Sequence, residues 1–195
     1  MFFTGVGSRE KRAPKEAQAL LREVARQLAL AGFVGRSGAA DGIDAAVEAG
    51  IDAAGGKKEI YLPWKGFNDS TSPLHEVSSE ALALAATVHP AWGVMSQGEK
   101  KLHGRNMYQV LGKSLNAPSF LTVCWTPDGC ESEKERKKDT GGTASAIVLS
   151  DRRGIPVFNL RRPGALRRLA QFLASHGIQV DLPDEPAALT QAPLF

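Results

Sequence analysis

The chain has 195 residues, of which 43% are hydrophobic and 23% are charged, enough for one domain with a buried core. Its formal net charge of +3 permits an anionic ligand but is much weaker than the basic excess of a dedicated DNA-binding protein. No apolar run approaches the ~20 residues that cross a bilayer, and the N-terminus lacks the pattern of a secretory signal, so we expect a cytoplasmic protein with no membrane partner.

Short apolar runs alternate along the chain with segments whose leucines and alanines recur at helical spacing. This alternation predicts an α/β fold, a Rossmann-like three-layer sandwich with a mostly parallel, doubly wound sheet. We expect one domain over residues 1–182 and an extended C-terminal tail over residues 183–195, which contain three prolines. The expected strands cover residues 1–5, 33–35, 59–62, 120–125 and 157–160, and the expected helices cover residues 14–31, 43–54, 76–87, 98–111, 143–153 and 164–176.

The most informative feature is the glycine-punctuated turn VGRSGAADGID at residues 34–44, which connects an expected strand to an expected helix. Glycines let the backbone approach a ligand closely, and the first N–H groups of a helix donate hydrogen bonds to anions. A guanidinium suits bidentate contact with phosphate. We therefore interpret Arg36, Ser37, Gly38 and Gly42 as phosphate-binding residues. The alternative is a tight connection whose glycines serve only the backbone geometry.

Other residues follow strand ends and are expected at the same crevice, because ligands of open parallel sheets bind outside the carboxyl ends of the strands. Two glycine-bearing turns at this edge predict a nucleotide-type, phosphate-bearing ligand. We expect the protein to require no further cofactor. The chain contains neither the complete G-x-G-x-x-G fingerprint nor a P-loop, so neither a standard NAD site nor a P-loop site is indicated. The candidate ligand residues in these two turns are Gly7, Ser8, Arg9, Gly141, Gly142 and Thr143.

Two further elements supply candidate contacts. On the expected helix over residues 98–111, Arg105 and Asn106 are our preferred pair for a ribose or phosphate, and a solvated helix face is the alternative. Trp64 follows the third expected strand, where it can stack on a base or serve as a packing plug.

Residues 126–139 mix charges of both signs without an apolar period, which predicts a solvated, mobile loop. It is interpreted either as a lid over the crevice or as a plain surface insertion. Cys124 and Cys130 are too far apart for a C-x-x-C motif and have no histidine nearby, so we expect two reduced thiols and no metal site.

Three motifs carry a family resemblance: TGVGSR at residues 4–9, SGAADGID at residues 37–44, and GGT at residues 141–143 followed by GIPVFN at 154–159. Over about residues 1–160 the chain resembles the Rossmann-like SLOG superfamily, shared by DNA-processing protein A and the LOG nucleotide phosphoribohydrolases. The second motif is most similar to that of DNA-processing protein A. The resemblance implies a doubly wound domain whose glycine turns hold a nucleotide-type ligand or DNA phosphates, as in small stand-alone relatives from bacteria and phages.

The sequence departs from the family pattern in ways that leave three functions open. LOG hydrolases place a glutamate after their glycine-threonine turn, whereas Ala-Ser-Ala follows Thr143 here. An N-glycosidase, or phosphoribohydrolase, would need Asp44 or Asp41 as its acid, although Asp41 is equally suited to cap the helix and Asp44 to meet its dipole. The first function is nucleotide binding in a sensor, sequestering or processing role, the second is hydrolysis with catalytic Asp44, and the third is single-stranded DNA binding in recombination, without an appended winged-helix module.

The last five residues, QAPLF, resemble the short peptides by which bacterial proteins dock on the DNA polymerase sliding clamp. Gln191, Leu194 and Phe195 suit an apolar pocket on such a partner. The alternative is that Leu194 and Phe195 pack on the protein's own core. The oligomeric state is open, because dimers through a sheet edge or a helix face are common at this size.

Overall fold

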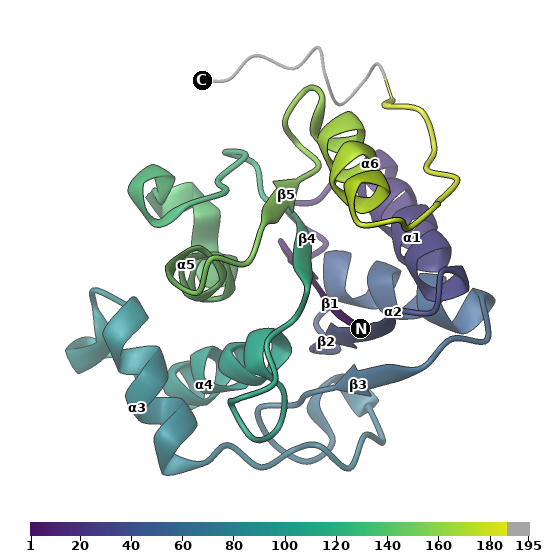
Figure 1. Cartoon of the computed structure of the whole chain (residues 1–195). Coiled ribbons are helices and arrows are strands. Elements are labelled where there is room, and N and C mark those ends of the chain that lie inside the picture. Colours follow the sequence, from purple (N-terminus) through teal and green to yellow (C-terminus); the bar gives the residue numbers. More distant parts are fainter. Residues whose placement is uncertain (187–195) are drawn as a thin grey trace.

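The computed structural model describes residues 1–186, so the predicted clamp-docking residues Gln191, Leu194 and Phe195 lie outside the described residues. Its centre is a sheet in which every described pairing is parallel, with the strand order β3-β2-β1-β4-β5. The predicted α/β fold is confirmed (Figure 1). The strands are β1 (Phe2–Gly7), β2 (Val34–Ser37), β3 (Lys58–Ile60), β4 (Leu121–Trp125) and β5 (Val157–Asn159).

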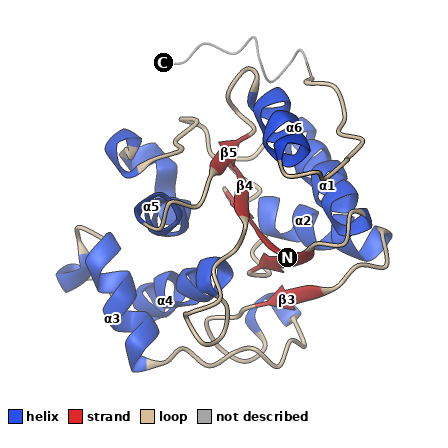
Figure 2. Ribbon diagram, in the orientation of Figure 1, coloured by secondary structure: helices blue, strands red, loops and turns tan. Residues whose placement is uncertain are grey.

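Helices cover both faces of the sheet, which gives the three layers of a Rossmann-like sandwich (Figures 1 and 2). One face carries α1 (Lys15–Leu30), α2 (Ile43–Ala53) and α6 (Ala165–Ser175), and the other carries α3 (Ser79–Val88), α4 (Gln97–Leu111) and α5 (Ala144–Arg152). Among residues 1–186, no helix combines the length and apolar character that crossing a bilayer requires.

The apolar runs of the sequence form the buried layers on each side of the sheet. All five residues of β4 are buried, as expected for a central parallel strand covered on both faces. On one side Leu21 and Val24 of α1 pack in the same cluster as Phe3 of β1. On the other side Met107 of α4 and Ile147 of α5 share a second cluster. These two clusters hold the helices in fixed positions around the strand ends.

The order of the strands creates a switch point between β1 and β4. From β1 the chain proceeds outward to β2 and β3, and it then returns past β1 to form β4 and β5 on the other side. Gly7 at the end of β1 lies in register with Trp125 at the end of β4. In doubly wound sheets the crevice beyond such a pair of strands is where ligands bind.

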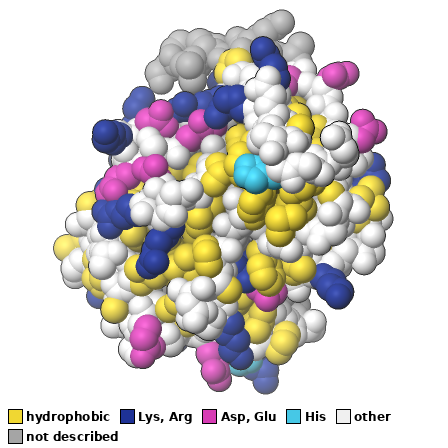
Figure 3. All heavy atoms as spheres, viewed as in Figure 1, with side chains coloured by type: hydrophobic (Ala, Val, Ile, Leu, Met, Phe, Trp, Pro, Cys, Tyr) yellow, Lys and Arg dark blue, Asp and Glu magenta, His cyan; other side chains and the backbone are white. Residues whose placement is uncertain are grey.

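Residues 126–139 differ from the predicted solvated loop. Thr126 and Cys130 are buried, and the Asn159 amide nitrogen donates to Thr126 Oγ1 at 2.7 Å and to the Cys130 carbonyl at 2.9 Å. The charges are paired across the fold, as between Arg162 and Glu135 at 2.6 Å, and Figure 3 shows basic and acidic side chains side by side on the surface. The prediction of a solvated loop is wrong for Thr126 and Cys130, whereas the charged residues Lys134, Lys137, Lys138 and Asp139 are exposed as expected. Cys124 and Cys130 are free thiols, as predicted, and burial raises the pKa of both.

The segment after α6 lies against the domain. Ile178 and Leu182 pack on the cluster beneath α1 and α6. The Glu185 carboxylate accepts hydrogen bonds from the Gly164 and Leu166 N–H groups, at 2.9 and 3.2 Å. These groups lie at the N-terminus of α6, where the positive end of the helix dipole stabilises a negative charge. The described beginning of the predicted tail is therefore without regular secondary structure and attached to the N-terminus of α6.

Candidate functional site

A cavity of about 260 Å³ lies at the carboxyl ends of β1 and β4, at the switch point of the sheet. Its walls are the loop after β1, the start of α2, one face of α4 and the turn before α5. Of the predicted site residues, those that line it are Gly7, Ser8, Arg9, Asp44, Arg105, Asn106, Gly141, Gly142 and Thr143. Those that do not line it are Arg36, Ser37, Gly38, Gly42 and Trp64.

Asp44 and Arg105 form a buried ion pair in the cavity wall. Asp44 Oδ2 accepts from Arg105 Nη1 at 3.1 Å, and Asp44 Oδ1 accepts from the Gly7 N–H at 3.2 Å. Burial raises the pKa of the Asp44 carboxyl, while the Arg105 guanidinium and the Gly7 N–H favour its ionised form. With both oxygens already accepting hydrogen bonds, Asp44 is arranged to fix Arg105 and the loop after β1 rather than to release a proton.

A chain of hydrogen bonds continues from this pair across α4. The surroundings of Gln109 place its amide oxygen 3.1 Å from Arg105 Nη1 and 3.0 Å from the Gly38 N–H, and its amide nitrogen 3.0 Å from Asn106 Oδ1. Asn106 Nδ2 then donates to the Gly142 carbonyl at 3.0 Å. The four walls of the cavity are therefore linked by one polar network.

Helix α4 supplies most of this network, and its sequence explains its position. A capping box starts the helix, because Ser96 Oγ accepts from the Glu99 N–H at 3.3 Å and the Glu99 carboxylate accepts from the Ser96 N–H at 2.8 Å. From there Arg105 and Gln109, four residues apart, lie on one face. Met107 packs on the sheet side. Arg105 and Asn106 are buried in the cavity wall, so the alternative of a solvated helix face is wrong for these two residues.

One hydrogen-bond donor of the Arg105 guanidinium has no partner among residues 1–186. Its side chain is only 6% exposed, and within residues 1–186 its Nε has no hydrogen-bond partner. A buried donor without an acceptor costs about 1–3 kcal/mol. Arg105 lies in the cavity wall, but its Nε is covered by the protein, so an acceptor on a ligand reaches that atom only if the wall around it moves.

The lining of the cavity is cationic. Three guanidinium groups, those of Arg9, Arg12 and Arg105, lie in the wall with a single carboxylate, that of Asp44. Arg12 Nη2 is 3.0 Å from Asp139 Oδ1, and in the described part of the chain Arg9 forms no ion pair. The turn formed by residues 141–143 lies directly before α5, so the positive end of that helix adds to the field. The site therefore favours an anion.

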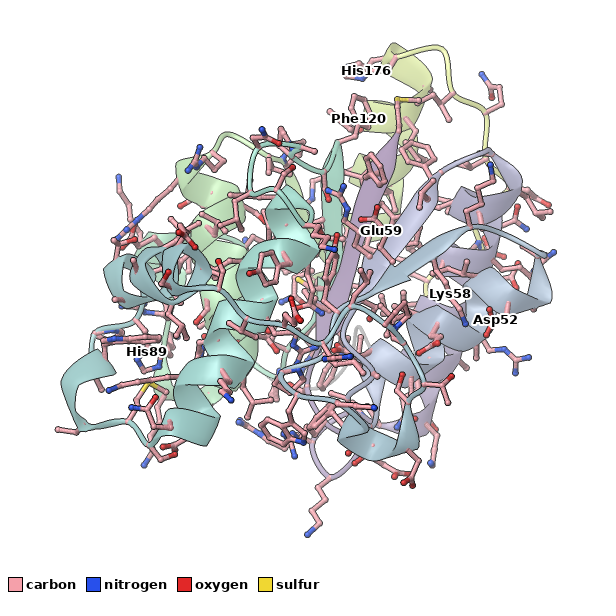
Figure 4. All side chains as sticks on the ribbon, turned by 90° about the horizontal axis from the view of Figure 1, so that it is seen from below. Asp52, Lys58, Glu59, His89, Phe120 and His176 are labelled. Atoms are coloured by element: carbon pink, nitrogen blue, oxygen red, sulfur yellow. The ribbon has the colours of Figure 1, made fainter. Side chains whose placement is uncertain are left out.

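His103 adds a neutral polar group. Its Nδ1 is 2.5 Å from Ser145 Oγ, and its ring centroid is 4.4 Å from that of His89, which is labelled in Figure 4. Burial, with smaller contributions from His89 and Arg105, lowers the pKa of His103 to about 4. At neutral pH the imidazole is uncharged and can only exchange hydrogen bonds with a ligand.

Arg36 and Ser37 interact within the protein. Arg36 is buried, and its Nε donates to Glu59 Oε2 at 2.7 Å while its guanidinium lies 3.7 Å from the centre of the Phe2 ring. Glu59, labelled in Figure 4, is its register partner on β3. Ser37 Oγ donates to the Gly5 carbonyl at 2.8 Å. Both side chains hold strands together and lie outside the cavity lining.

The two glycines of the predicted cradle make room for the protein's own atoms. A Cβ on Gly38 would lie 1.0 Å from Arg105 Nη1, and one on Gly42 would lie 2.5 Å from the Glu10 nitrogen. Gly42, with φ of 88°, is also the residue that precedes α2, so the expected N-cap at Asp41 is wrong. Asp41 is exposed and lies outside the lining. Gly38 and Gly42 therefore pack against residues of the cavity wall without lining the cavity themselves.

Trp64 is 40% exposed and packs edge-to-face on Phe67 rather than lining the cavity. The sequence interpretation also missed Arg12 and Thr140, both of which line it. Arg12 comes five residues after Gly7 and Thr140 directly precedes Gly141, so proximity to the two predicted turns was the signal that could have identified them.

Comparison with protein-family models, curated proteins and solved structures finds no match for this chain. Within residues 1–186, no three His, Cys, Asp or Glu side chains come together in a way that could hold a metal ion.

Proposed function

We propose that this protein binds a phosphate-bearing nucleotide in the cavity at the ends of β1 and β4. The observation that carries the proposal is the cationic cavity wall, in which Arg9 and Arg12 accompany the buried cation Arg105 while the lining holds a single carboxylate. Asp44 orients this cation without using all of its donors. Phosphate oxygens are strong acceptors for a guanidinium held in this way.

The rest of the lining supports a nucleotide rather than a bare anion. The cavity of about 260 Å³ is smaller than the roughly 300–1,000 Å³ of typical drug-sized sites, so it suits a sugar and phosphate with the base nearer the opening. Leu102 and Ala40 provide apolar wall opposite the polar groups, and Asn106 and His103 provide groups that can meet hydroxyls. The motifs that resemble the SLOG superfamily add support for a nucleotide-type ligand.

Binding is favoured over hydrolysis by the state of the one carboxylate in the lining. Asp44 accepts from Arg105 and Gly7, so neither of its oxygens is arranged to protonate a leaving base. Single-stranded DNA, the other candidate, would contact many phosphates and lose affinity steeply with added salt. The cation excess of the site is confined to a small cavity, which favours a small ligand.

The test is to incubate the purified protein with mixed nucleoside monophosphates and diphosphates and NAD, and to identify retained and converted species by liquid chromatography with mass detection. We expect a nucleotide retained intact by the wild type and by Arg22→Gln, an exposed control on α1. Retention should weaken on the order of tenfold in Arg9→Gln, as expected for losing a charged hydrogen bond. Release of free base would replace the proposal with hydrolysis, and no retention with salt-sensitive binding of an oligonucleotide would replace it with DNA binding.

A further inference from the structure

Two segments far apart in the sequence meet through Arg12 and Asp139. Arg12 lies in the loop after β1, and Asp139 lies in the 3-10 helix η4 (Lys138–Thr143) that leads into α5. Arg12 Nη2 donates to both the Asp139 carbonyl and Asp139 Oδ1, each at 3.0 Å. Their side chains are 42% and 74% exposed, so the contact lies at the surface.

This contact lies beside the candidate nucleotide site. Arg12 belongs to the cavity lining, and a Cβ on Gly141, another lining residue, would be 3.4 Å from Arg12 Nη1. Exposed ion pairs contribute little to stability because water competes with them. A more highly charged anion arriving from the cavity can therefore take the place of the Asp139 carboxylate on Arg12.

Two of the cations that line the cavity differ in how far they are buried. Arg105 is 6% exposed and forms the inner position, whereas Arg12 is 42% exposed and forms the outer one. The inner guanidinium is held by Asp44, an ion pair 5–6% exposed that a ligand does not easily break. Within residues 1–186, the outer guanidinium is held by Asp139 alone. Both guanidinium groups line the same cavity, so a ligand with two linked phosphates offers one anionic group for each of them.

We propose that the ligand is a nucleoside diphosphate whose inner phosphate is bound by Arg105 and whose outer phosphate replaces the Asp139 carboxylate on Arg12. This inference rests on the proposed function and adds the class of ligand to it. Asp139 then acts as a competitor within the chain, which lowers the affinity for any ligand that lacks the second phosphate.

The test is calorimetric titration of ADP and of AMP into the wild type, Arg12→Gln, Asp139→Asn and the double variant, with Arg22→Gln as control. The wild type should bind ADP on the order of tenfold more tightly than AMP. Arg12→Gln should abolish that preference. Asp139→Asn should raise the affinity for ADP by roughly two- to fivefold, the range of an exposed ion pair, and it should have no effect when Arg12 is already replaced.

The outcomes separate this inference from the proposed function. Equal affinities for ADP and AMP in the wild type would overturn the diphosphate assignment and leave nucleotide binding in place. An Asp139→Asn effect that persists in the Arg12→Gln background would show that Asp139 acts through general charge, and it would overturn the competition. Failure of every variant to bind either nucleotide, with folding verified by circular dichroism, would overturn both proposals.

Discussion

The two turns at the carboxyl edge of the sheet both contain two glycines, but the structure uses those glycines in opposite ways. In residues 37–42, the space beside the glycines is filled by the protein itself, with Arg105 against Gly38 and the backbone of residues 8–10 against Gly42. In residues 140–143, a Cβ on Gly142 would meet nothing within 4 Å, and the turn lines the cavity. A glycine-rich turn is therefore a ligand site only where the chain leaves its space open.

Residues 37–42, the closed turn, support residues 140–143, the open turn, through side chains of α4. Gly38 admits the Arg105 guanidinium, and its N–H donates to Gln109. Those two side chains belong to the network that reaches the Gly142 carbonyl through Asn106. The first turn thus positions the cation, and the second turn presents the backbone to the ligand.

Replacing Arg105 should have the largest effect, because it leaves Asp44 as a buried charge without a partner. We expect Arg105→Leu to lower the free energy of unfolding by about 3–5 kcal/mol, measured by urea denaturation at pH 7. Adding Asp44→Asn should restore part of the loss because the uncompensated charge is removed. A loss within experimental error for Arg105→Leu alone would mean that the pair does not support the walls.

Acidification should lower the free energy of unfolding through His103, which contacts Ser145 at the start of α5. Its pKa is about 4 in the folded chain against 6.5 for the unperturbed group, so its contribution is complete above pH 6.5. Between pH 6.5 and pH 4 the unfolded chain takes up the proton first, and the free energy of unfolding should fall by about 3 kcal/mol at most.

This slope can be assigned by substitution. Urea denaturation from pH 4 to pH 7.5 should show a shallower pH dependence for His103→Gln than for the wild type. His75→Gln, outside the cavity lining, is the control for replacing a histidine elsewhere in the chain. Identical slopes for all three proteins would remove His103 from the explanation.

The closed turn should not accept a methyl group. A Cβ at residue 38 requires the Arg105 guanidinium to move, since the two would be 1.0 Å apart. We expect Gly38→Ala to cost about 1–3 kcal/mol of stability, as overpacking does in a filled site. A melting temperature equal to that of the wild type would show that the Arg105 guanidinium does not fill the space beside Gly38.

The open turn should accept the same methyl group with the smallest effect on stability. We expect Gly142→Ala to change the free energy of unfolding by less than about 0.5 kcal/mol, as for a substitution into open space. Nucleotide retention should nevertheless decrease, because the added methyl group occupies the lining. Equal losses of stability at residues 38 and 142 would contradict the distinction between the two turns.

Much of the fold could be predicted because its parallel strands are buried on both faces and read as apolar runs. The helix expected over residues 98–111 is α4 (Gln97–Leu111), and the strand expected over residues 120–125 is β4 (Leu121–Trp125). The convergence of the loop after β1 with residues 141–143 was also predictable, because parallel strands end at one edge. In these two cases only the first residue of the element differs, by one position.

The failures have a common physical cause, which is a partner far away in the sequence. Arg36 has the chemistry of a phosphate ligand, but its register partner on the next strand is Glu59, and the sequence does not reveal register. Gly38 owes its role to Arg105, 67 residues later. Glu135 looked solvated because its partner Arg162 follows later in the chain, between β5 and α6.

The most direct test of the account is a nuclear magnetic resonance titration of the isotope-labelled wild-type protein with ADP. We predict that the largest shifts fall on the backbone N–H groups of residues 141–143 and on the Arg105 Nε–H, with smaller shifts for residues 37–42. The largest shifts in residues 37–42, or no shift at the Arg105 Nε–H at saturating ADP, would contradict the claim that the turn before α5 and this buried cation form the nucleotide site.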